Sequence, residues 1–410
     1  MPIAAQVRRA LESPRGRWRL RRRAGAVLGH AAKSLLIPLL SPLVALLVVR
    51  LAGVGLWGEF VRVLVVAQLA AHVAGWGNKD YLLREFSARP ASLPAAWQRG
   101  LLARLPLWAT GCGALALLGL DWTRWLGACL LALALTIAQS FEVFIIYKRA
   151  FGLALLVEAA GMAVLAGAVL AWGPRLRVEH LLLLFAAASG LKAGLLWARF
   201  RGEAGQSGAG RFDWRWLIAA FPFFALGFSG LLQSRMDLYA VSAFLPPAEI
   251  GRYQVFMNFI IYLQAVAAFV LVPFLKGLYR LDYRRLLGLS GQMAVLGVLV
   301  CSAGIPALAL GLRYVFGLSY APGFFLAGML CVLPLYVYAP TIYAFFKAGR
   351  PWVVVALNLA GAAVSGALLV WWLPPHGTLG AIWASATAQL ILAGAYLVLG
   401  RRLVERDVIP

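Results

Sequence analysis

The sequence predicts an all-α integral membrane protein with twelve transmembrane helices. Hydrophobic residues make up 62% of its 410 residues, whereas charged residues make up only 13%. Apolar runs of about 20 residues recur up to the C-terminus. No segment between these runs is long enough to bury a hydrophobic core of its own. These observations together favour one integral membrane domain.

Each span is placed where an apolar run begins and ends at charged residues, glycine or proline. A helix rises 1.5 Å per residue, so about 20 residues cross a hydrocarbon layer about 30 Å thick. The expected spans, in chain order, are 26–49, 57–77, 101–120, 125–145, 151–173, 178–199, 217–243, 250–275, 286–309, 322–346, 351–373 and 378–400.

The distribution of Lys and Arg predicts the orientation of these spans, because basic loops stay in the cytoplasm. With a cytoplasmic N-terminus, cytoplasmic segments hold 28 Lys and Arg, external helix ends hold seven, and three lie within helices. Both termini are therefore expected in the cytoplasm. The same bias explains the net charge of +23 through anionic lipid headgroups, without nucleic acid as a partner.

Several functional classes find no support in the sequence. "GHAAKS" (29–34) approaches a phosphate-binding loop, but Ala32 replaces the glycine that must precede the lysine. The basic N-terminus leads into an apolar run too long for a signal peptide, so the first helix is expected to stay. The four cysteines have no metal-binding spacing. We expect neither ATP hydrolysis nor a bound metal or cofactor.

Two pairs of similar segments indicate an internal repeat. "LAGVGLWGEFV" (51–61) and "LPPAEIGRYQV" (245–255) place an aromatic residue two positions after a glycine, at the start of a helix. A second pair comprises "YKRAF" (147–151) followed by Glu158, and "FFKAG" (345–349) followed by Asn358. Six helices per copy give both copies the same orientation, and transporters of this kind bind substrate between the copies.

The chain also resembles a known family. The spacing from Asp237 to "EIGRY" (249–253), "FGLSYA" (316–321) and "NLAGAAVSGALLVWWLPPHGTLGAIWAS" (358–385) are similar to the O-antigen-type polysaccharide flippase branch of the multidrug/oligosaccharidyl-lipid/polysaccharide exporter superfamily. The resemblance implies two six-helix lobes in a V that open alternately to each side. It further implies transfer of polyprenyl-pyrophosphate-linked sugar from the inner to the outer leaflet, for surface polysaccharide biosynthesis.

On this basis the chain divides into a tail, two lobes, a linker and a second tail. The expected bounds are a basic cytoplasmic tail (1–25), an N-terminal lobe (26–200), a cytoplasmic inter-lobe linker (201–216), a C-terminal lobe (217–400) and a cytoplasmic tail (401–410). The expected location is a bacterial inner membrane. The implied partners are the lipid bilayer, the lipid-linked oligosaccharide and a polysaccharide polymerase.

Cations within the membrane are the candidate substrate-binding residues. A Lys or Arg at the centre of a helix costs about 2.5–3.5 kcal/mol on insertion scales, so such residues are expected to face a hydrated cavity. A pyrophosphate requires cations of this kind. The candidates for binding the pyrophosphate or sugar are Lys33, Arg50, Arg62, Arg235 and Tyr239.

The segment "QSRMDLYAVSAF" (233–244) carries two polar stripes on one helix. Arg235 and Asp237 are about 200° apart, whereas Gln233 shares a face with Asp237, and Arg235 shares a face with Tyr239. We assign the Arg235 stripe to the central cavity. We assign Asp237 and Gln233 to the interior of the C-terminal lobe, as a site that couples transport to H⁺ or Na⁺.

Alternative assignments stay open at this point. Arg235 could extend to the external headgroups while Asp237 pairs with another arginine. Glu142, Glu158 and Lys192 lie at similar depth, and structural ion pairing is their expected use. An ion-coupled multidrug-type exporter would carry cations and would offer carboxylates in its cavity. A membrane glycosyltransferase or polymerase would need catalytic residues on larger external loops.

Overall fold

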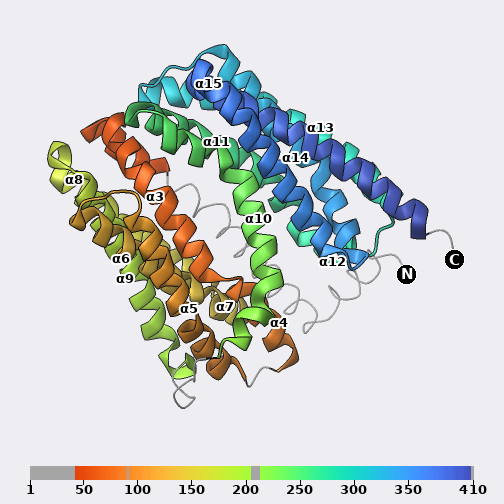
Figure 1. Cartoon of the computed structure of the whole chain (residues 1–410), viewed down its shortest axis with the longest axis horizontal. Helices are drawn as coiled ribbons and strands as arrows, with labels where there is room; N and C mark the ends of the chain where they lie inside the picture. Colours follow the sequence, from red (N-terminus) through yellow and green to blue (C-terminus); the bar gives the residue numbers. More distant parts are fainter. Residues whose placement is uncertain (1–41, 90–91, 205–212, 408–410) are drawn as a thin grey trace, which may run out of the picture.

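The computed structural model describes residues 42–89, 92–204 and 213–407 (Figure 1). Within these ranges all regular secondary structure is helical. Nine of the helical segments described there are long and apolar enough to cross a membrane. The predicted all-α membrane fold is therefore confirmed.

The N-terminal lobe follows the expected spans closely. Its long helices are α3 (Val54–Gly75), α5 (Leu93–Ala116), α6 (Trp122–Ser140), α8 (Phe151–Trp172) and α9 (Val178–Ala204), and its short helices are α4 (Asn78–Ala88) and α7 (Glu142–Lys148). The first expected span lies outside the described residues up to residue 41, and it continues as the helical segment Pro42–Ala52. Helix α5 begins eight residues before the predicted span.

The C-terminal lobe contains the remaining helices. They are α10 (Arg215–Phe244), α11 (Pro247–Leu271), the 3₁₀-helix η3 (Val272–Phe274), α12 (Leu275–Leu278), α13 (Tyr283–Leu310) with the following π-helix η4 (Gly311–Phe316), α14 (Pro322–Lys347) and α15 (Pro351–Asp407). Helix α15 covers the last two expected spans. The chain reverses direction at Gly377, whose φ of 54° and ψ of −139° are not helical.

Local sequence explains where several helices begin. Asp121 caps α6 by accepting a 2.9 Å hydrogen bond from the Arg124 N–H, and Asp282 caps α13 in the same way through the Arg285 N–H. Helices α11, α14 and α15 begin at a proline, which has no N–H to leave unsatisfied in a first helical turn. Capping aspartates and prolines of this kind can be recognised in the sequence alone.

The two lobes contact each other at one end and diverge at the other. Figure 1 shows α3 and α5–α9 (red to yellow-green) in one bundle and α11–α15 (green to blue) in the other. Helices α3 and α11 pack directly on each other where the bundles meet. Following the predicted orientation, we call this the outer end. The opposite end, which carries α4, α7 and α12, is the inner end.

Helix α10 joins the two lobes in space as well as in sequence. It packs on α15 at its midpoint, where Asn358 donates a 3.4 Å hydrogen bond to Ser229, and along its outer half. Its inner half packs on α4 and on the end of α3, where Trp76 donates a 2.8 Å hydrogen bond to the Leu217 carbonyl. Helix α10 therefore contacts both lobes, the N-terminal lobe through its inner half and α15 through its middle and outer half.

Candidate functional site

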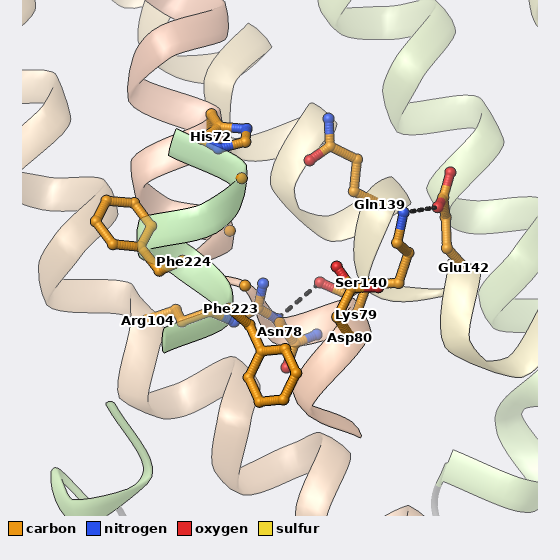
Figure 2. A pocket seen from close by; sticks show the side chains of 13 residues that line it. His72, Asn78, Lys79, Asp80, Arg104, Gln139, Ser140, Glu142, Phe223 and Phe224 are labelled. Carbon is orange, nitrogen blue, oxygen red and sulfur yellow. Dashed lines mark hydrogen bonds and ion pairs between the residues drawn. The ribbon is translucent and has the colours of Figure 1, made fainter. Parts of the chain in front are cut away.

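A cavity lies at the inner end between the N-terminal lobe and α10 (Figure 2). Its volume is about 290 Å³. The residues that line it come from α3, α4, α5, α6, α7 and α10: His72, Gly75, Gly77, Asn78, Lys79, Asp80, Arg104, Gln139, Ser140, Glu142, Phe223, Phe224 and Gly227. We call it the inner cavity.

Arg104 is the buried cation of the inner cavity, with only 2% of its surface exposed. Its Nε donates to the Gly100 carbonyl and its Nη2 donates to Ser140 Oγ, both at 2.8 Å. The Ser140 hydroxyl donates its own proton to the Thr136 carbonyl. The lone pairs of Ser140 Oγ are therefore free to accept from Arg104. Among the described residues no carboxylate bonds to Arg104. Its charge therefore has only neutral partners, and further guanidinium N–H groups remain available to a ligand.

One polar atom in the wall of this cavity has no hydrogen-bond partner among the described residues. Asn78 is buried, and its Oδ1 accepts no hydrogen bond from any described residue. A buried acceptor without a donor costs free energy, and such an atom often marks a position that a ligand or water fills. Asn78 and Arg104 both line the inner cavity, so both point to a polar occupant.

Lys79 and Glu142 form a more exposed ion pair on the same wall. Lys79 Nζ lies 3.6 Å from a Glu142 oxygen, and both side chains are partly open to solvent (Figure 2). An exposed pair of this length adds little to stability. It does, however, place the carboxylate of Glu142 beside a cation other than Arg104.

Aromatic side chains of α10 close the inner cavity on the other side. The Trp76 ring stacks on Phe224 at a centroid distance of 4.0 Å, and Trp76 has a left-handed φ of 44°. A Cβ at the neighbouring Gly77 would lie 2.5 Å from the Phe224 backbone nitrogen, so α10 approaches this turn as closely as glycine allows. This close approach fixes the inner half of α10 to the N-terminal lobe.

A second cavity, of about 270 Å³, lies within the N-terminal lobe and shares Gln139 and Glu142 with the first. Lys192 donates a 2.6 Å hydrogen bond to Glu158 in its wall. Both side chains are about four-fifths buried, so this is a partly buried ion pair. The structure thus pairs Glu158 with Lys192, and Glu142 with Lys79.

The Asp237 stripe of α10 points into the C-terminal lobe. Asp237 is 4% exposed, and its carboxylate accepts hydrogen bonds from the Tyr253 hydroxyl and the Leu238 N–H at 2.5 and 2.8 Å. A small cavity beside it, which Gln233 and Ser385 also line, leaves about 20 Å³ for water-sized molecules. That volume is enough for one water or one small cation.

The Arg235 stripe lies on a different face of α10. The side chains of Gln233 and Met236 lie beside Gly361 and Gly366, so their face of α10 meets α15. Arg235 is about 200° around the helix from Gln233 and therefore lies on another face. Arg235 and Tyr239 are half-buried, and Arg235 forms no hydrogen bond or ion pair with any described residue. Its charge, like that of Arg104, is not neutralised by a bonded carboxylate in the described part of the chain.

Arg50 and Arg62 lie at the outer end and are already bonded. Arg50 donates to the carbonyls of Val315 and Tyr314 at 2.7 and 3.0 Å. Arg62 donates to the carbonyls of Ser242 and Leu245 at 3.0 and 2.7 Å. Both residues precede the C-terminal lobe in the chain, and all four carbonyls belong to that lobe. Lys33, the remaining candidate cation, lies outside the described residues.

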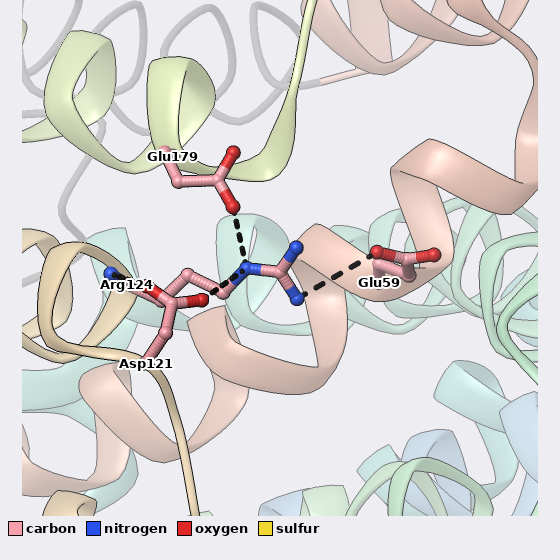
Figure 3. A network of polar contacts seen from close by, with 4 residues as sticks. All are labelled: Glu59, Asp121, Arg124 and Glu179. Carbon is pink, nitrogen blue, oxygen red and sulfur yellow. Dashed lines mark hydrogen bonds and ion pairs between the residues drawn. The ribbon is translucent and has the colours of Figure 1, made fainter.

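An ionic network also holds the outer end of the N-terminal lobe together (Figure 3). Arg124 lies 2.6 Å from Glu179, 3.0 Å from Asp121 and 3.9 Å from Glu59. These residues come from α6, its N-cap, α9 and α3, so the network ties α3 to its own lobe. Arg124 bridges three carboxylates from three elements, which favours a structural role for this arginine.

The most buried cation of the inner cavity was not among the sequence candidates. Arg104 lies just inside the predicted span 101–120, and the charge count assigns it to the cytoplasmic flank of that span. The extension of α5 back to Leu93 places Arg104 in the middle of a helix, and α6 covers it. A basic residue four positions inside an apolar run is the signal that could have identified it.

Comparison with solved structures identifies the fold. The chain is similar to a structure named "Lipid II flippase MurJ, inward closed conformation", with a TM-score of 0.66 and 12% identity over 90% of this chain and 86% of that one. It is also similar to an inward-facing MATE-family multidrug resistance transporter, with a TM-score of 0.64 and 12% identity over 93% and 100%. A structure of the MATE multidrug transporter DinF-BH aligns with a TM-score of 0.52 and 15% identity over 92% and 93%.

No protein-family model matches the sequence, and no curated protein sequence matches it. The structural likenesses show the fold, which is that of the multidrug/oligosaccharidyl-lipid/polysaccharide exporters, as the sequence resemblance implied. The solved structures that share it are named as flippases and transporters, not as enzymes. Flippases and drug exporters have this fold in common, so only the residues of the site distinguish between them.

Proposed function

We propose that the protein is a flippase that moves a polyprenyl-pyrophosphate-linked oligosaccharide from the inner to the outer leaflet by alternating access. The proposed location is a bacterial inner membrane with both termini in the cytoplasm, as part of surface polysaccharide biosynthesis. A polysaccharide polymerase that uses the flipped product is the proposed protein partner. The fold supports a transporter, and the balance of charges within the spans supports an anionic cargo.

The observation that carries this proposal is the difference between acids and cations inside the described spans. Arg104 and Arg235 have no bonded carboxylate there. The half-buried and buried acids of the cavity walls each have a partner, in Glu142–Lys79, Glu158–Lys192 and Asp237–Tyr253, whereas Asp80 of the inner cavity is exposed and bonds to no described cation. An exporter of cations needs a carboxylate that is free to meet its cargo, whereas a pyrophosphate needs a free guanidinium.

The two arginines also differ in depth, as a transfer across the membrane requires. Arg104 lines the inner cavity, whereas Arg235 lies nine residues, or about 13 Å, from the outer end of α10. Of the other candidates, Lys33 would add a cation near the inner side. Tyr239 would offer an amphipathic ring beside Arg235. We propose Arg104 as the first contact of the pyrophosphate and Arg235 as a later one.

A cation gradient is the proposed energy source. Asp237 is a buried carboxylate beside a cavity that holds one water or one small cation. Gln233 and Ser385 add uncharged oxygens on the same wall. Hard cations such as Na⁺ prefer oxygen ligands, and a proton would bind the carboxylate directly. We therefore propose that Asp237 binds H⁺ or Na⁺ during the transport cycle.

The test is a deletion strain in which lipid-linked oligosaccharide is measured separately in each leaflet. We expect normal synthesis with accumulation in the inner leaflet, because the protein moves the lipid but does not build it. Blocked synthesis would instead indicate an enzyme. Normal leaflet distribution together with increased sensitivity to cationic drugs would indicate a multidrug-type exporter.

Complementation of this strain tests the arginines. Arg104→Gln and Arg235→Ala should lower export about ten- to a hundredfold, since a hydrogen bond to a charged group contributes about 1.5–3 kcal/mol. Arg235→Lys should retain part of the activity. Arg99→Gln is the matched control, because Arg99 is exposed on the same helix and bonds to the Ala95 carbonyl. Wild-type export by Arg104→Gln and Arg235→Ala, at normal membrane levels, would contradict the proposed site.

A further inference from the structure

The outer end of the molecule closes through an unusually close helix crossing. A Cβ on Gly58 of α3 would lie 1.6 Å from the Pro247 carbonyl oxygen, and a Cβ on Gly251 of α11 would lie 2.3 Å from the Val54 oxygen. No side chain fits at either position while the two helices are in contact. The two glycines therefore allow the lobes to meet here.

The crossing joins the two copies of the internal repeat. Gly58 and Gly251 each come from the repeated segment, near the start of α3 and near the start of α11. Beside them, Trp57 donates a 2.8 Å hydrogen bond to Gln254, and both side chains are buried. The two glycine approaches thus have approximate twofold symmetry, and a buried polar pair lies beside them.

Arg50 and Arg62 extend this contact through main-chain oxygens. Arg62 bonds to Ser242 and Leu245, the last turn and C-cap of α10, whose carbonyls have no partner within their own helix. Arg50 bonds to the carbonyls of Tyr314 and Val315 in η4, the π-helix that follows α13. Helix C-termini carry partial negative charge, so a guanidinium is well placed there.

These four bonds cannot survive an opening of the outer end. Arg124 bonds to Glu59 and Glu179 and thereby ties α3 to the N-terminal lobe, so Arg62 moves with that lobe. Its carbonyl partners move with the C-terminal lobe. Separation of α3 from α11 therefore leaves Arg62 without acceptors. Arg50, whose acceptors also belong to the other lobe, loses them in the same movement.

We propose that Arg50 and Arg62 form a latch that exchanges one set of oxygen ligands for another. When the outer end is closed, they bind the carbonyls of the C-terminal lobe. When it opens, they bind the phosphate oxygens of an anionic headgroup. The identity of that headgroup rests on the proposed function, whereas the carbonyl latch rests on the closed geometry alone.

The exchange links release of the anion to closure of the outer end. Phosphate oxygens and main-chain carbonyls compete for the same N–H groups, so a bound anion holds the outer end open. Departure of the anion leaves two solvated guanidinium groups facing orphan carbonyls. Closure of the outer end then restores the four bonds. This favours return of the protein to its inward-facing state after the cargo has left.

The first arm of the test measures outer opening without any cargo. A single cysteine replaces Ser242, which is 4% exposed, in a background whose four native cysteines are replaced. Its rate of labelling by a membrane-impermeant thiol reagent reports opening of the outer end in the purified, reconstituted protein. We expect Arg50→Ala with Arg62→Ala to raise this rate at least fivefold, and Gly58→Val to raise it further. Arg252→Ala is the control, because Arg252 is exposed at the start of α11 and forms no side-chain bond across the lobes to a described residue.

The second arm adds inorganic pyrophosphate, with sulfate at equal ionic strength as the control. We expect pyrophosphate, but not sulfate, to raise the labelling rate of the otherwise wild-type protein. The Arg50→Ala, Arg62→Ala variant should show no response. Unchanged labelling in the Arg50→Ala, Arg62→Ala variant, alongside a raised rate in Gly58→Val, would overturn the latch. A wild-type protein indifferent to pyrophosphate would overturn the exchange.

Failure of the proposed function would look different. The labelling rates are measured without lipid-linked sugar, so the effect of the arginine variant does not depend on the cargo. A deletion strain with normal leaflet distribution would remove the oligosaccharide as cargo and leave the labelling results as they are. The two proposals can therefore fail separately.

Discussion

The two lobes use the same helix contact in chemically different ways. In the N-terminal lobe, Glu158 of α8 bonds to Lys192 of α9. In the C-terminal lobe, the position that the repeat matches to Glu158 is Asn358, and it accepts a 3.0 Å hydrogen bond from the Tyr396 hydroxyl. An ion pair in one copy thus corresponds to a neutral hydrogen bond in the other.

This difference shows how charge is divided within the molecule. The N-terminal lobe places charged groups beside its cavities, at Glu142, Glu158, Lys192 and Arg104. The C-terminal lobe buries neutral polar groups, and its one buried acid within the described spans is Asp237. Neutral hydrogen bonds hold a scaffold together at low desolvation cost, whereas buried charges are costly and are more often retained for function.

The largest effect is expected from breaking the ion pair of the N-terminal lobe. Glu158→Ala leaves Lys192 without its carboxylate, which should lower the free energy of unfolding by about 3 kcal/mol. The measurement is thermal unfolding of the purified protein in detergent. The double variant Glu158→Gln, Lys192→Met should recover most of the loss, because no charge then remains unpaired. An equally unstable double variant would mean that packing, not charge, is responsible.

An intermediate effect is expected at the buried acid of the C-terminal lobe. Tyr253→Phe removes the hydroxyl that donates to Asp237, which should destabilise the protein by about 1–3 kcal/mol. Asp237→Asn removes the charge but keeps the shape, so its main effect should be on coupling. We expect export by this variant to lose its dependence on an imposed Na⁺ or pH gradient in proteoliposomes. Unchanged gradient dependence would exclude Asp237 as the coupling site.

The smallest effect is expected at the neutral contact. Tyr396→Phe removes the hydroxyl that bonds to Asn358, in a side chain that otherwise stacks on Tyr338. A hydrogen bond between neutral groups contributes about 1 kcal/mol, so the unfolding midpoint should shift by a few degrees at most. Export should stay at the wild-type level. A loss as large as that of Glu158→Ala would remove the distinction between the lobes.

Some features were correctly predicted because they depend on nearby residues. Apolar runs, basic flanks and prolines indicate where the helices lie. Every expected span within the described residues contains a helix. The prediction that Asp237 and Arg235 lie on different faces of one helix needed only its 3.6-residue period. Which lobe or cavity each face meets depends on packing against α15 and α11, which no local pattern contains.

Other features could not be predicted because they involve residues distant in the chain. Arg50 and Arg62 look like free cations in the sequence, but their partners are main-chain carbonyls about 180 to 265 positions away. Main-chain carbonyls are present at every residue, so composition gives no sign of such a bond. The inner half of α10 belongs to the C-terminal lobe in sequence, yet it packs on the N-terminal lobe.

The sequence by itself determined the membrane setting, the helix positions and the duplication, because hydrophobicity, helix breakers and repeats are properties of short segments. Only the tertiary structure decided which charges are neutralised. Lys192 bonds to a carboxylate, whereas Arg50, Arg62 and Arg104 bond only to neutral oxygens among the described residues. Arg235 bonds to no described residue. The physical reason is that the free energy of a charge in a membrane protein depends on the groups that folding places around it.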